Sequence, residues 1–250
     1  MTGETLPPPF RFVAYESIGS TNDEAKRLAR AGEPEGLVIC ADRQTAGRGR
    51  RGRTWFSPLG NLYASMLLRP RCRAAEAVQL GFVAALAVAD AIAELAPTIG
   101  VRCKWPNDVL ANGKKISGIL LETEMASGDI PDFIVLGIGA NLVASPSDTP
   151  YPATSLAEEG AAGVTPRLMA VALIRRFAEW AGVWREHGFA PIRTAWLLRA
   201  ASLGEMIQVR LERATLDGRF LDLDGDGALL LGTPSGERRI AAGEVFPVAA

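Results

Sequence analysis

The chain has 250 residues, 48% of them hydrophobic, and its 27 basic residues nearly balance its 28 acidic ones. This composition excludes an intrinsically disordered chain, because it supplies enough apolar surface for a full core. A net charge of −1 also argues against a surface made for duplex DNA or an anionic membrane, since both need a broad excess of basic charge. The length is compatible with one or two domains.

Cysteine, histidine and hydropathy patterns predict a cytoplasmic protein that does not associate with membranes. The N-terminus lacks the basic and apolar regions of a signal peptide. The longest apolar run, Leu80 to Ala89, is well short of the ~20 residues that span a bilayer. Three cysteines without C-x-x-C spacing indicate reduced packing residues. A single histidine, His187, excludes a His-rich zinc site and argues against a Ser-His-Asp triad.

Strands and helices alternate in the first hundred residues. The pattern predicts strands at residues 10–15, 37–41 and 61–68 and helices at 20–31 and 74–96. Ser20 with Asp23, or Thr21 with Glu24, has capping-box spacing at the start of the first helix. The second helix carries its polar residues on one narrow strip, so we expect it to lie mostly buried against a sheet.

After residue 100 the predicted strands and helices continue to about residue 203, and from residue 204 only short strands are predicted. Asn112-Gly113 is a type I′ hairpin signal, and Thr165-Pro166 is a helix N-cap followed by proline. The pattern predicts strands at 101–105, 109–111, 115–124 and 130–138, a loop at 144–154, helices at 165–186 and 191–200, and four short strands at 206–211, 215–223, 228–231 and 238–241. We therefore predict an α+β domain over residues 1–203 and a small all-β module over 204–250.

The segment from Gly47 to Arg53 places four arginines and three glycines in seven positions. It matches G-x-G-x-x-G formally, but no helix start follows and no kinase motif lies downstream, so we reject both nucleotide-binding versions. Glycines permit close backbone approach, and arginines offer charge-assisted forks to phosphate or carboxylate. The residues predict a loop that closes over an anion like a lid, with Trp55 able to stack on a flat ring. A solvated basic loop is the alternative.

Two further motifs offer polar groups beside predicted strands. Asn107, in the stretch from Lys104 to Asp108, can both donate and accept hydrogen bonds, as a purine edge requires, although the stretch taken alone favours an ordinary turn. Lys115, followed by Gly118, is compatible with a backbone-lined ligand site or with an exposed hairpin lysine. The acidic stretch 222–227 starts like a calcium loop but has threonine where the bidentate glutamate belongs, so we expect a β-turn.

Taken together and in this order, the motifs closely resemble those of the biotin–protein ligases, also called biotin–[acetyl-CoA-carboxylase] ligases. The motifs are S-T-N at 20–22, Gln44, G-R-G-R-x-x-R-x-W at 47–55, K-W-P-N-D at 104–108, K-x-S-G-I at 115–119 and G-A-N at 139–141. The match extends from about residue 10 to the C-terminus. It implies a catalytic domain similar to class II aminoacyl-tRNA synthetases, followed by an SH3-like β-barrel.

The resemblance implies a two-step reaction. The carboxylate of biotin attacks the α-phosphate of ATP, and a lysine of a biotin carboxyl carrier domain then takes the biotinyl group from biotinyl-5′-AMP. Biotin contacts are implied for Ser20, Thr21, Asn22, Gln44, Gly47, Arg48, Gly49, Arg50, Lys115 and Gly118. ATP or adenylate contacts are implied for Arg50, Arg53, Trp55, Lys104, Asn107 and Asn141. Catalytic roles are implied for Arg48, Arg50 and Lys115, together with Mg²⁺, whose ligands the sequence does not identify.

Several expectations concern partners. Bifunctional members of the family carry an N-terminal helix-turn-helix, whereas here only about ten residues precede the first predicted strand. We therefore expect a ligase that does not bind DNA, and a homodimer is compatible with the sequence. Ala242-Gly243-Glu244 departs from the Gly-Gly-Glu-like segment of the family. Two alternatives are kept: a lipoate–protein ligase, which uses a related acyl-adenylate, and a nucleic-acid-binding protein that uses residues 47–53 as a basic arm.

Overall fold

A computed structural model describes residues 6–247, which form a seven-stranded mixed sheet, a five-stranded antiparallel sheet and the helices between them. The large sheet has the strand order β1-β2-β3-β7-β6-β5-β4. Only its edge pair, β1 with β2, is parallel. Its strands are β1 Arg11–Ile18, β2 Leu37–Gln44, β3 Leu62–Leu68, β4 Val101–Lys104, β5 Asp108–Ala111, β6 Lys114–Ser127 and β7 Ile130–Ala140.

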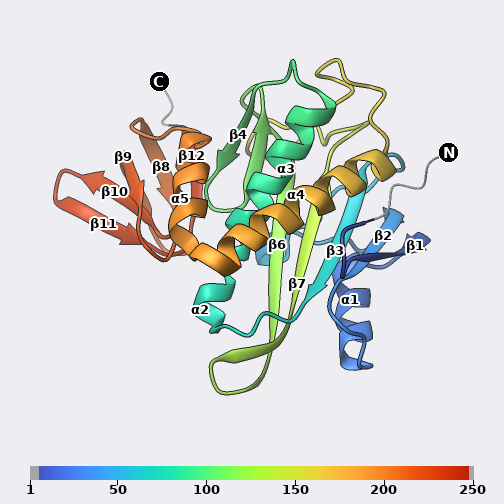
Figure 1. Ribbon diagram of the computed structural model, residues 1–250. Helices are drawn as coiled ribbons and strands as arrows, with labels where there is room; N and C mark the ends of the chain where they lie inside the picture. The colour runs from blue at the N-terminus through green and yellow to red at the C-terminus, as the bar shows by residue number, and fades with distance from the viewer. Residues whose placement is uncertain (1–5, 248–250) are drawn as a thin grey trace.

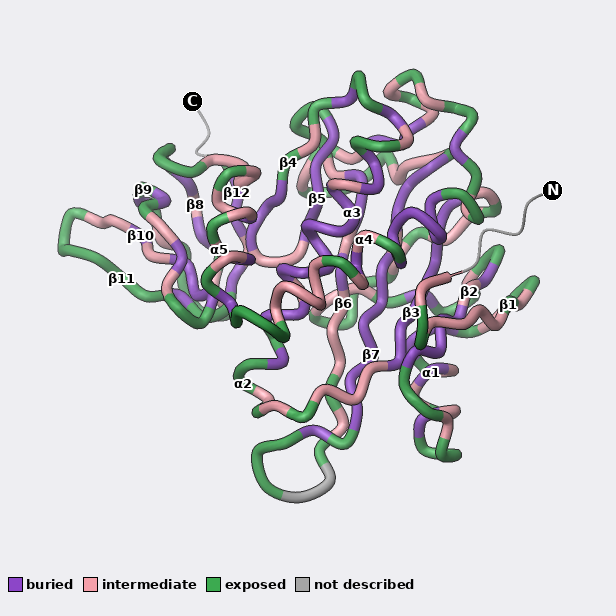
Figure 2. The backbone as a smooth tube through the Cα atoms, in the orientation of Figure 1, coloured by how far each residue is buried: buried purple, intermediate pink, exposed green. Residues whose placement is uncertain are grey.

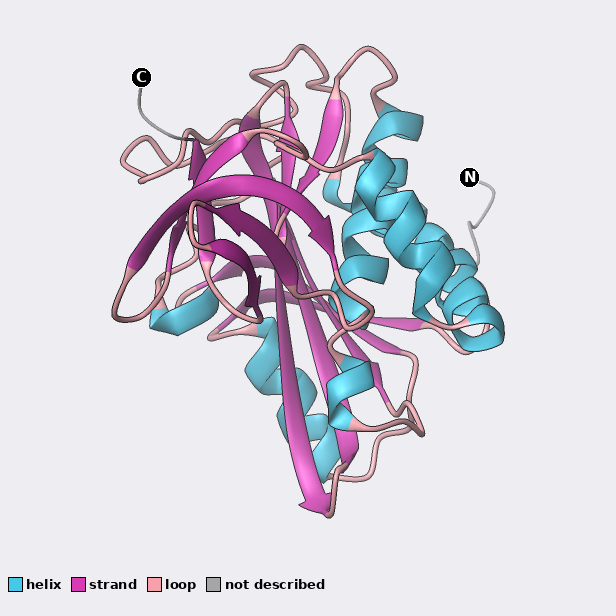
Figure 3. Cartoon of the chain, turned by 90° about the vertical axis from the view of Figure 1, so that its left-hand side faces the viewer, coloured by secondary structure: helices cyan, strands magenta, loops and turns pink. Residues whose placement is uncertain are grey.

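Helices cover both faces of the large sheet (Figures 1 and 3). Helices α3 and α4 pack together on one face, and α1 lies on the other face against β2, β3 and β7. The helices are α1 Thr21–Arg30, α2 Ala74–Ala77, α3 Leu80–Leu95, α4 Pro166–His187 and α5 Phe189–Leu198. The predicted α+β organisation of this part of the chain is therefore confirmed.

Alternate residues of the central strands enter two different cores, as the period of a strand requires. Val38 and Met66 belong to the large core under α3 and α4, whereas their neighbours Ile39 and Leu67 belong to the smaller core under α1. Figure 2 shows the purple, buried backbone running through the middle of the large sheet. The two cores hold β2, β3 and β7 in fixed register, so the ends of these strands can position a site.

The predicted helix over 74–96 is two helices, α2 and α3. Around Val78 and Gln79 the backbone makes tighter bonds of the 3₁₀ type, such as Gln79 N to Glu76 O at 3.0 Å. Gln79 is buried there, and its Oε1 accepts a hydrogen bond from Trp184 Nε1 at 2.8 Å. By length and composition the stretch Ala74–Leu95 could cross a membrane. Most of it is buried against the sheet and α4, as expected for a core helix.

The predicted cap of α1 is wrong, whereas the cap of α4 is confirmed. Ser20 is the N-cap residue of α1, but its side chain makes no capping hydrogen bond. Asp23 is unavailable for capping because it pairs with Arg48 and Lys26. In α4 the side chain of Thr165 accepts a hydrogen bond from Leu168 N at 3.3 Å. The Asn112-Gly113 turn has the two positive φ angles, 47° and 81°, of a type I′ hairpin.

The C-terminal sheet has the order β11-β10-β9-β8-β12, with every pair antiparallel. Its strands are β8 Met206–Arg210, β9 Thr215–Leu223, β10 Leu229–Thr233, β11 Gly236–Ile240 and β12 Glu244–Pro247. Strand β12 was not predicted, because four residues that end in proline give no alternating pattern. It pairs with β8, so the end of the described chain returns toward the large sheet.

Side chains of the large domain fasten this second sheet at its β9–β10 turn. Trp105 Nε1 donates to Gly227 O at 3.0 Å, and Arg193 Nε donates to Leu223 O at 2.6 Å. The turn itself is closed by Asp224, whose Oδ1 accepts from the backbone N of Asp226 and of Ala228 at 2.9 Å. This confirms a turn, rather than a calcium loop, at residues 222–227.

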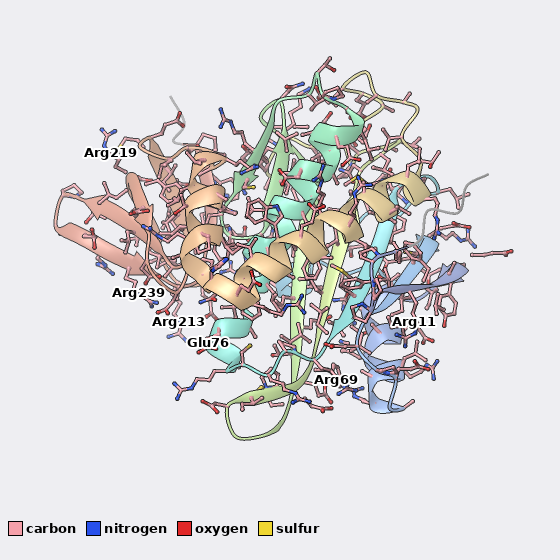
Figure 4. The ribbon with its side chains drawn as sticks, viewed as in Figure 1. Arg11, Arg69, Glu76, Arg213, Arg219 and Arg239 are labelled. Carbon is pink, nitrogen blue, oxygen red and sulfur yellow. The ribbon has the colours of Figure 1, made fainter. Side chains whose placement is uncertain are left out.

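Several charged side chains at the periphery are paired with opposite charges. Arg11 binds Glu33, and Arg69 binds Asp132, both at the end of the molecule that carries α1 (Figure 4). Arg239 pairs with Asp226 on the C-terminal sheet (Figure 4). Exposed pairs of this kind contribute little to stability. Their effect is to balance surface charge at these three points.

Candidate active site

A cleft of about 390 Å³ lies where the arginine-rich loop meets the large sheet. The start of α1, the loop 44–56, the β4–β5 turn, strands β6 and β7, the loop 146–153 and strand β12 contribute to its walls. Of the residues predicted for the site, the cleft is lined by Ser20, Thr21, Asn22, Gln44, Arg48, Gly49, Arg50, Arg53, Trp55, Lys104, Asn107, Lys115, Gly118 and Asn141. Gly47 lies just behind the lining, where a Cβ would come within 2.6 Å of Ser57 Oγ.

A hydrogen-bond network builds the end of the cleft nearest α1. Thr21 donates from both its N and its Oγ1 to Gln44 Oε1, at 2.8 and 3.0 Å. Ser65, fully buried on β3, bonds Thr21 Oγ1 at 2.8 Å and Asn22 Oδ1 at 2.6 Å. Gln44 Nε2 in turn donates to Ser57 Oγ at 3.3 Å. These contacts fix the orientation of neutral donors and acceptors before any ligand arrives.

Asn22 is wedged against the sheet. Its Nδ2 donates to Glu122 Oε2 at 2.7 Å, and its side chain lies so close to Gly137 that a Cβ at this glycine would overlap Asn22 Oδ1. Glycine is therefore required at position 137 by close approach rather than by backbone angle.

Trp55 lies over the paired glycines of β6 and β7. Gly118 and Gly139 face each other in register, and a Cβ at Gly118 would come within 2.9 Å of the indole. At Gly139 the overlap with the indole would be more severe. The indole Nε1 is buried without a hydrogen-bond partner in the described residues. A flat ring thus rests on bare backbone, with one donor left for another molecule.

Each arginine of the loop is held by an acceptor. Arg48 makes a bidentate pair with Asp23, at 2.8 and 2.6 Å, and hydrogen bonding to Asp23 raises the pKa of Arg48. Arg50 Nη1 donates to Asn107 Oδ1 at 3.1 Å and to Gly243 O at 3.4 Å. Burial, followed by the charge of Arg51, lowers the pKa of Arg50.

Arg53 and Arg51 both pair with one carboxylate of the C-terminal sheet, that of Glu244 on β12. The arginine-rich loop therefore touches α1 through Arg48 and β12 through Arg53. Besides the packing of Trp55 on the glycines of β6 and β7, ion pairs anchor the loop to α1 and to β12.

Asp108 lies between two lysines at the centre of the cleft. Lys104 Nζ is 3.1 Å from its Oδ2, and Lys115 Nζ is 2.6 Å from its Oδ1. Burial alone would raise the pKa of Asp108, but the two ammonium groups hold it below its ordinary value. Lys104 is itself buried, which lowers its pKa, and its Nζ is 4.7 Å from the centre of the Tyr151 ring.

Two asparagines that were predicted for the nucleotide line the cleft. Asn107 Nδ2 donates to Ile119 O at 2.7 Å, so its amide is fixed between β6 and Arg50. Asn141 Nδ2 donates to Thr154 O at 3.0 Å, while its Oδ1 is buried without a partner among the described residues. An unsatisfied buried acceptor at this point indicates that a donor from a ligand or a water belongs there.

Sequence reasoning missed several residues of this site. Asp23 and Glu122 pair with loop and helix cations, and Ser65 orients two predicted ligand contacts. Asp108 is the last residue of the K-W-P-N-D motif at 104–108. An acidic residue between Lys104 and Lys115 in the sequence was the signal that could have identified it. Phe246 and Glu244 come from β12, and no sequence pattern placed that strand beside the cleft.

The chain matches two family models. One, described as the biotin/lipoate A/B protein ligase family, covers residues 14–141, and the other, the biotin protein ligase C-terminal domain, covers residues 202–246. The chain is 44% identical to the biotin–[acetyl-CoA-carboxylase] ligase of Paracoccus denitrificans over 91% of this chain and 96% of that protein. The chain belongs to the biotin protein ligase family.

Two further relatives agree with this assignment. The chain is 36% identical to the bifunctional ligase/repressor BirA of Bacillus subtilis, over 93% of this chain and 73% of that protein. A solved structure of the Aquifex aeolicus biotin protein ligase in complex with biotin and ATP superposes with a TM-score of 0.81 at 30% identity, covering 94% and 97% of the two chains. The predicted family and the predicted enzyme class are confirmed.

Proposed function

We propose that the cleft activates biotin with ATP to form biotinyl-5′-AMP and transfers the biotinyl group to a lysine of a biotin carboxyl carrier domain. One observation carries the proposal: the same cleft joins oriented neutral hydrogen-bonding groups at α1 to a cluster of arginine and lysine charges at the loop. A ligand with a polar uncharged ring at one end and a carboxylate at the other fits this division. Biotin is such a ligand, and the family to which the chain belongs uses it.

The neutral end would hold the ureido ring of biotin. Thr21, Ser20 and Gln44 offer hydroxyl and amide groups that match the N–H and C=O of that ring. Asn22, Gly47 and Gly49 would shape the same end. The bare backbone at Gly118 leaves room for the apolar part of the ligand, once Trp55 moves toward the nucleotide.

The charged end would supply the first step. Attack of a carboxylate oxygen on the α-phosphorus brings two anions together, and pyrophosphate leaves as the P–O bond breaks. Lys115 and Arg50 would stabilise the charge that develops on the phosphoryl oxygens. Arg48 is paired with the carboxylate of Asp23 in the structure. To bind the ligand, it would leave Asp23 and pair with the carboxylate of biotin instead.

The adenylate would occupy the far end. Asn107 and the unsatisfied Oδ1 of Asn141 offer polar contacts to the nucleotide, Arg53 would approach its phosphates, and the Trp55 indole would stack on the adenine. Closure of the arginine-rich loop would keep water from the mixed anhydride until the carrier docks.

Mg²⁺ would enter bound to the phosphates of ATP. Among the described residues, clusters of three or more potential metal ligands are not found. Of the carboxylates that line the cleft, those of Asp108 and Glu244 are already paired with lysine and arginine, which leaves Asp148 as a single carboxylate. This donor set fits a hydrated Mg²⁺ that is held mainly by phosphate oxygens, as is usual for this ion. When bound there, the ion neutralises charge on the transferring phosphates.

In the second step the neutral amine of the acceptor lysine attacks the carbonyl carbon of the anhydride. An amide bond forms, the bond to the phosphate oxygen breaks, AMP leaves, and the amine proton passes to solvent. The partner is then a carrier domain that presents its lysine in the cytoplasm, where ATP is available. A homodimer of the ligase remains compatible with this chemistry.

Finer features of the fold belong to the same proposal. A boundary between residues 203 and 204 would separate a catalytic domain of the class II aminoacyl-tRNA synthetase type from an SH3-like barrel. The antiparallel five-stranded sheet and the family match at 202–246 support this division. The nucleic-acid alternative is not favoured, because the chain belongs to the biotin protein ligase family.

Pyrophosphate release with biotin or with lipoate, measured side by side, tests the substrate. We expect release that depends on biotin and ATP, with lipoate at least ~100-fold less effective, because a site built for ureido hydrogen bonds leaves its polar groups unpaired around lipoate. Equal rates, or faster release with lipoate, would overturn the assignment to biotin.

A further inference from the structure

Lys104 was predicted to contact the adenylate, yet its ammonium group is enclosed by the protein. It is 7% exposed, and Asp108 Oδ2 lies 3.1 Å from its Nζ. The ring centres of Tyr151 and Phe246 lie 4.7 and 5.8 Å from the same nitrogen. A carboxylate and two aromatic rings are the usual compensation for a buried cation. Because these groups already surround the Lys104 ammonium, we expect it to interact only weakly with a phosphate.

The position of Asp108 explains what this charge could do. Its other oxygen, Oδ1, is 2.6 Å from Lys115 Nζ. A buried carboxylate with only one cationic partner binds that partner strongly, because the low local dielectric strengthens the attraction. With two ammonium groups on one carboxylate, the trio keeps a net positive charge. Lys115 can then leave Asp108 and move to an incoming anion.

We propose that Lys104 is a positioning residue that neutralises Asp108 and thereby releases Lys115 for the reacting carboxylate and phosphate. The inference rests on the proposed function only for the identity of those anions. Lys104 lines the cleft, but in this proposal it acts on the reaction through Asp108 rather than by binding a phosphate.

The C-terminal sheet contributes to the surroundings of Lys104. Phe246 is on β12, and its ring also lies 4.0 Å from Arg210 Cζ of β8. Tyr151 comes from the loop before α4, and its ring centre is 6.5 Å from that of Phe246. The two rings form an aromatic cover, Tyr151 with Phe246, over the Lys104 ammonium. The C-terminal sheet thus shields the Lys104–Asp108 pair from water.

The double-mutant test uses Lys104→Met, Asp108→Asn and both changes together. Lys104→Met leaves Asp108 with Lys115 alone, so we expect adenylate formation to slow about 10- to 100-fold while the KM for ATP changes less than about threefold. Adding Asp108→Asn removes the carboxylate that traps Lys115, so the double variant should form adenylate several-fold faster than Lys104→Met. If Lys104 binds phosphate directly, the double variant is no faster, and the KM for ATP rises.

Thermal unfolding gives a readout that needs no catalysis. The midpoint should fall with Lys104→Met and recover in part when Asp108→Asn is added, because the buried carboxylate that has lost one of its two cationic partners is then gone. Equal or lower midpoints in the double variant would overturn the pairing. If the wild-type protein forms no adenylate but the double variant still has a higher midpoint than Lys104→Met, the proposed function is contradicted and the pairing remains supported.

Two aromatic substitutions test the cover. Phe246→Leu keeps an apolar side chain but removes the ring, and we expect it to slow adenylate formation about threefold. Tyr151→Phe keeps its ring and loses only the hydrogen bond to Gly113 O, so its effect should be smaller than that of Phe246→Leu. Phe220→Leu, in the buried core of the same C-terminal sheet, controls for general loosening of that sheet. An effect of Phe246→Leu no larger than that of Phe220→Leu would contradict a role for the cover.

Discussion

The two ends of the cleft are built by different forces. At the α1 end, Thr21, Gln44 and Ser65 bond one another through neutral groups and rest on buried strands. At the loop end, Arg48 and Arg53 are held by the carboxylates of Asp23 and Glu244. Neutral networks on a sheet are rigid and change little with salt, whereas ion pairs exchange partners readily. The molecule thus has a preformed end for the ring and an exchangeable end for the anions.

The largest expected effect is at Lys115, on the exchangeable end. Lys115→Ala should reduce adenylate formation by about 10²- to 10³-fold, because an ammonium group is lost at the point where charge develops. Its effect on folding stability should be much smaller, since the Lys115 side chain is 28% exposed. Pyrophosphate release and thermal unfolding measure the two quantities. Lys114→Ala is the matched control, because Lys114 pairs with Glu159 outside the cleft. Equal rates for the two variants would remove Lys115 from the mechanism.

At the preformed end, Gly137→Ala should weaken biotin binding about tenfold and lower stability by about 1–3 kcal/mol, because the added methyl overlaps Asn22. Isothermal titration with biotin and chemical unfolding give these values. Gly81→Ala serves as control, since a Cβ there meets nothing within 4 Å. Unchanged biotin affinity in Gly137→Ala would show that the preformed end is less rigid than the contacts indicate.

A third expected effect concerns pH and Asp108. Its pKa is below the ordinary 3.8 in the folded protein, so its ion pairs stabilise the fold fully above that value and are lost as pH falls through the lower, folded pKa. The stability advantage of the wild type over Asp108→Asn should therefore be constant near neutral pH and shrink below about pH 4. Urea unfolding across this range measures it, with Asp129→Asn as an exposed control. If the stability advantage of the wild type grew as pH fell, the pKa of Asp108 would be raised rather than lowered in the folded protein.

The smallest effect is expected at Asp23. Asp23→Asn should lower the KM for ATP or biotin by about two- to threefold, because Arg48 no longer has to leave a competing carboxylate. Steady-state kinetics with each substrate gives the values, and Asp132→Asn, whose partner Arg69 is remote from the cleft, is the control. A raised KM would mean that Asp23 holds Arg48 in its working position instead.

The sequence allowed the large elements to be predicted, and all predicted site residues except Gly47 line the cleft, because strand periodicity and motif order are local properties. The short strand β12 was missed, and with it Phe246 and Glu244, which reach the cleft only through pairing with β8. The capping box at Ser20 failed because Asp23 binds Arg48 from a distant loop. Such contacts join residues far apart in the chain, so no local pattern reveals them. The role of each lining residue stays a prediction until it is measured.

Mass spectrometry of the protein mixed with biotin, ATP and Mg²⁺ tests the central claim most directly. We predict a product with the mass of biotinyl-5′-AMP, which appears with the wild type and is strongly reduced with Lys115→Ala but not with Lys114→Ala. Well-folded wild-type protein that forms no biotinyl-5′-AMP would contradict the account.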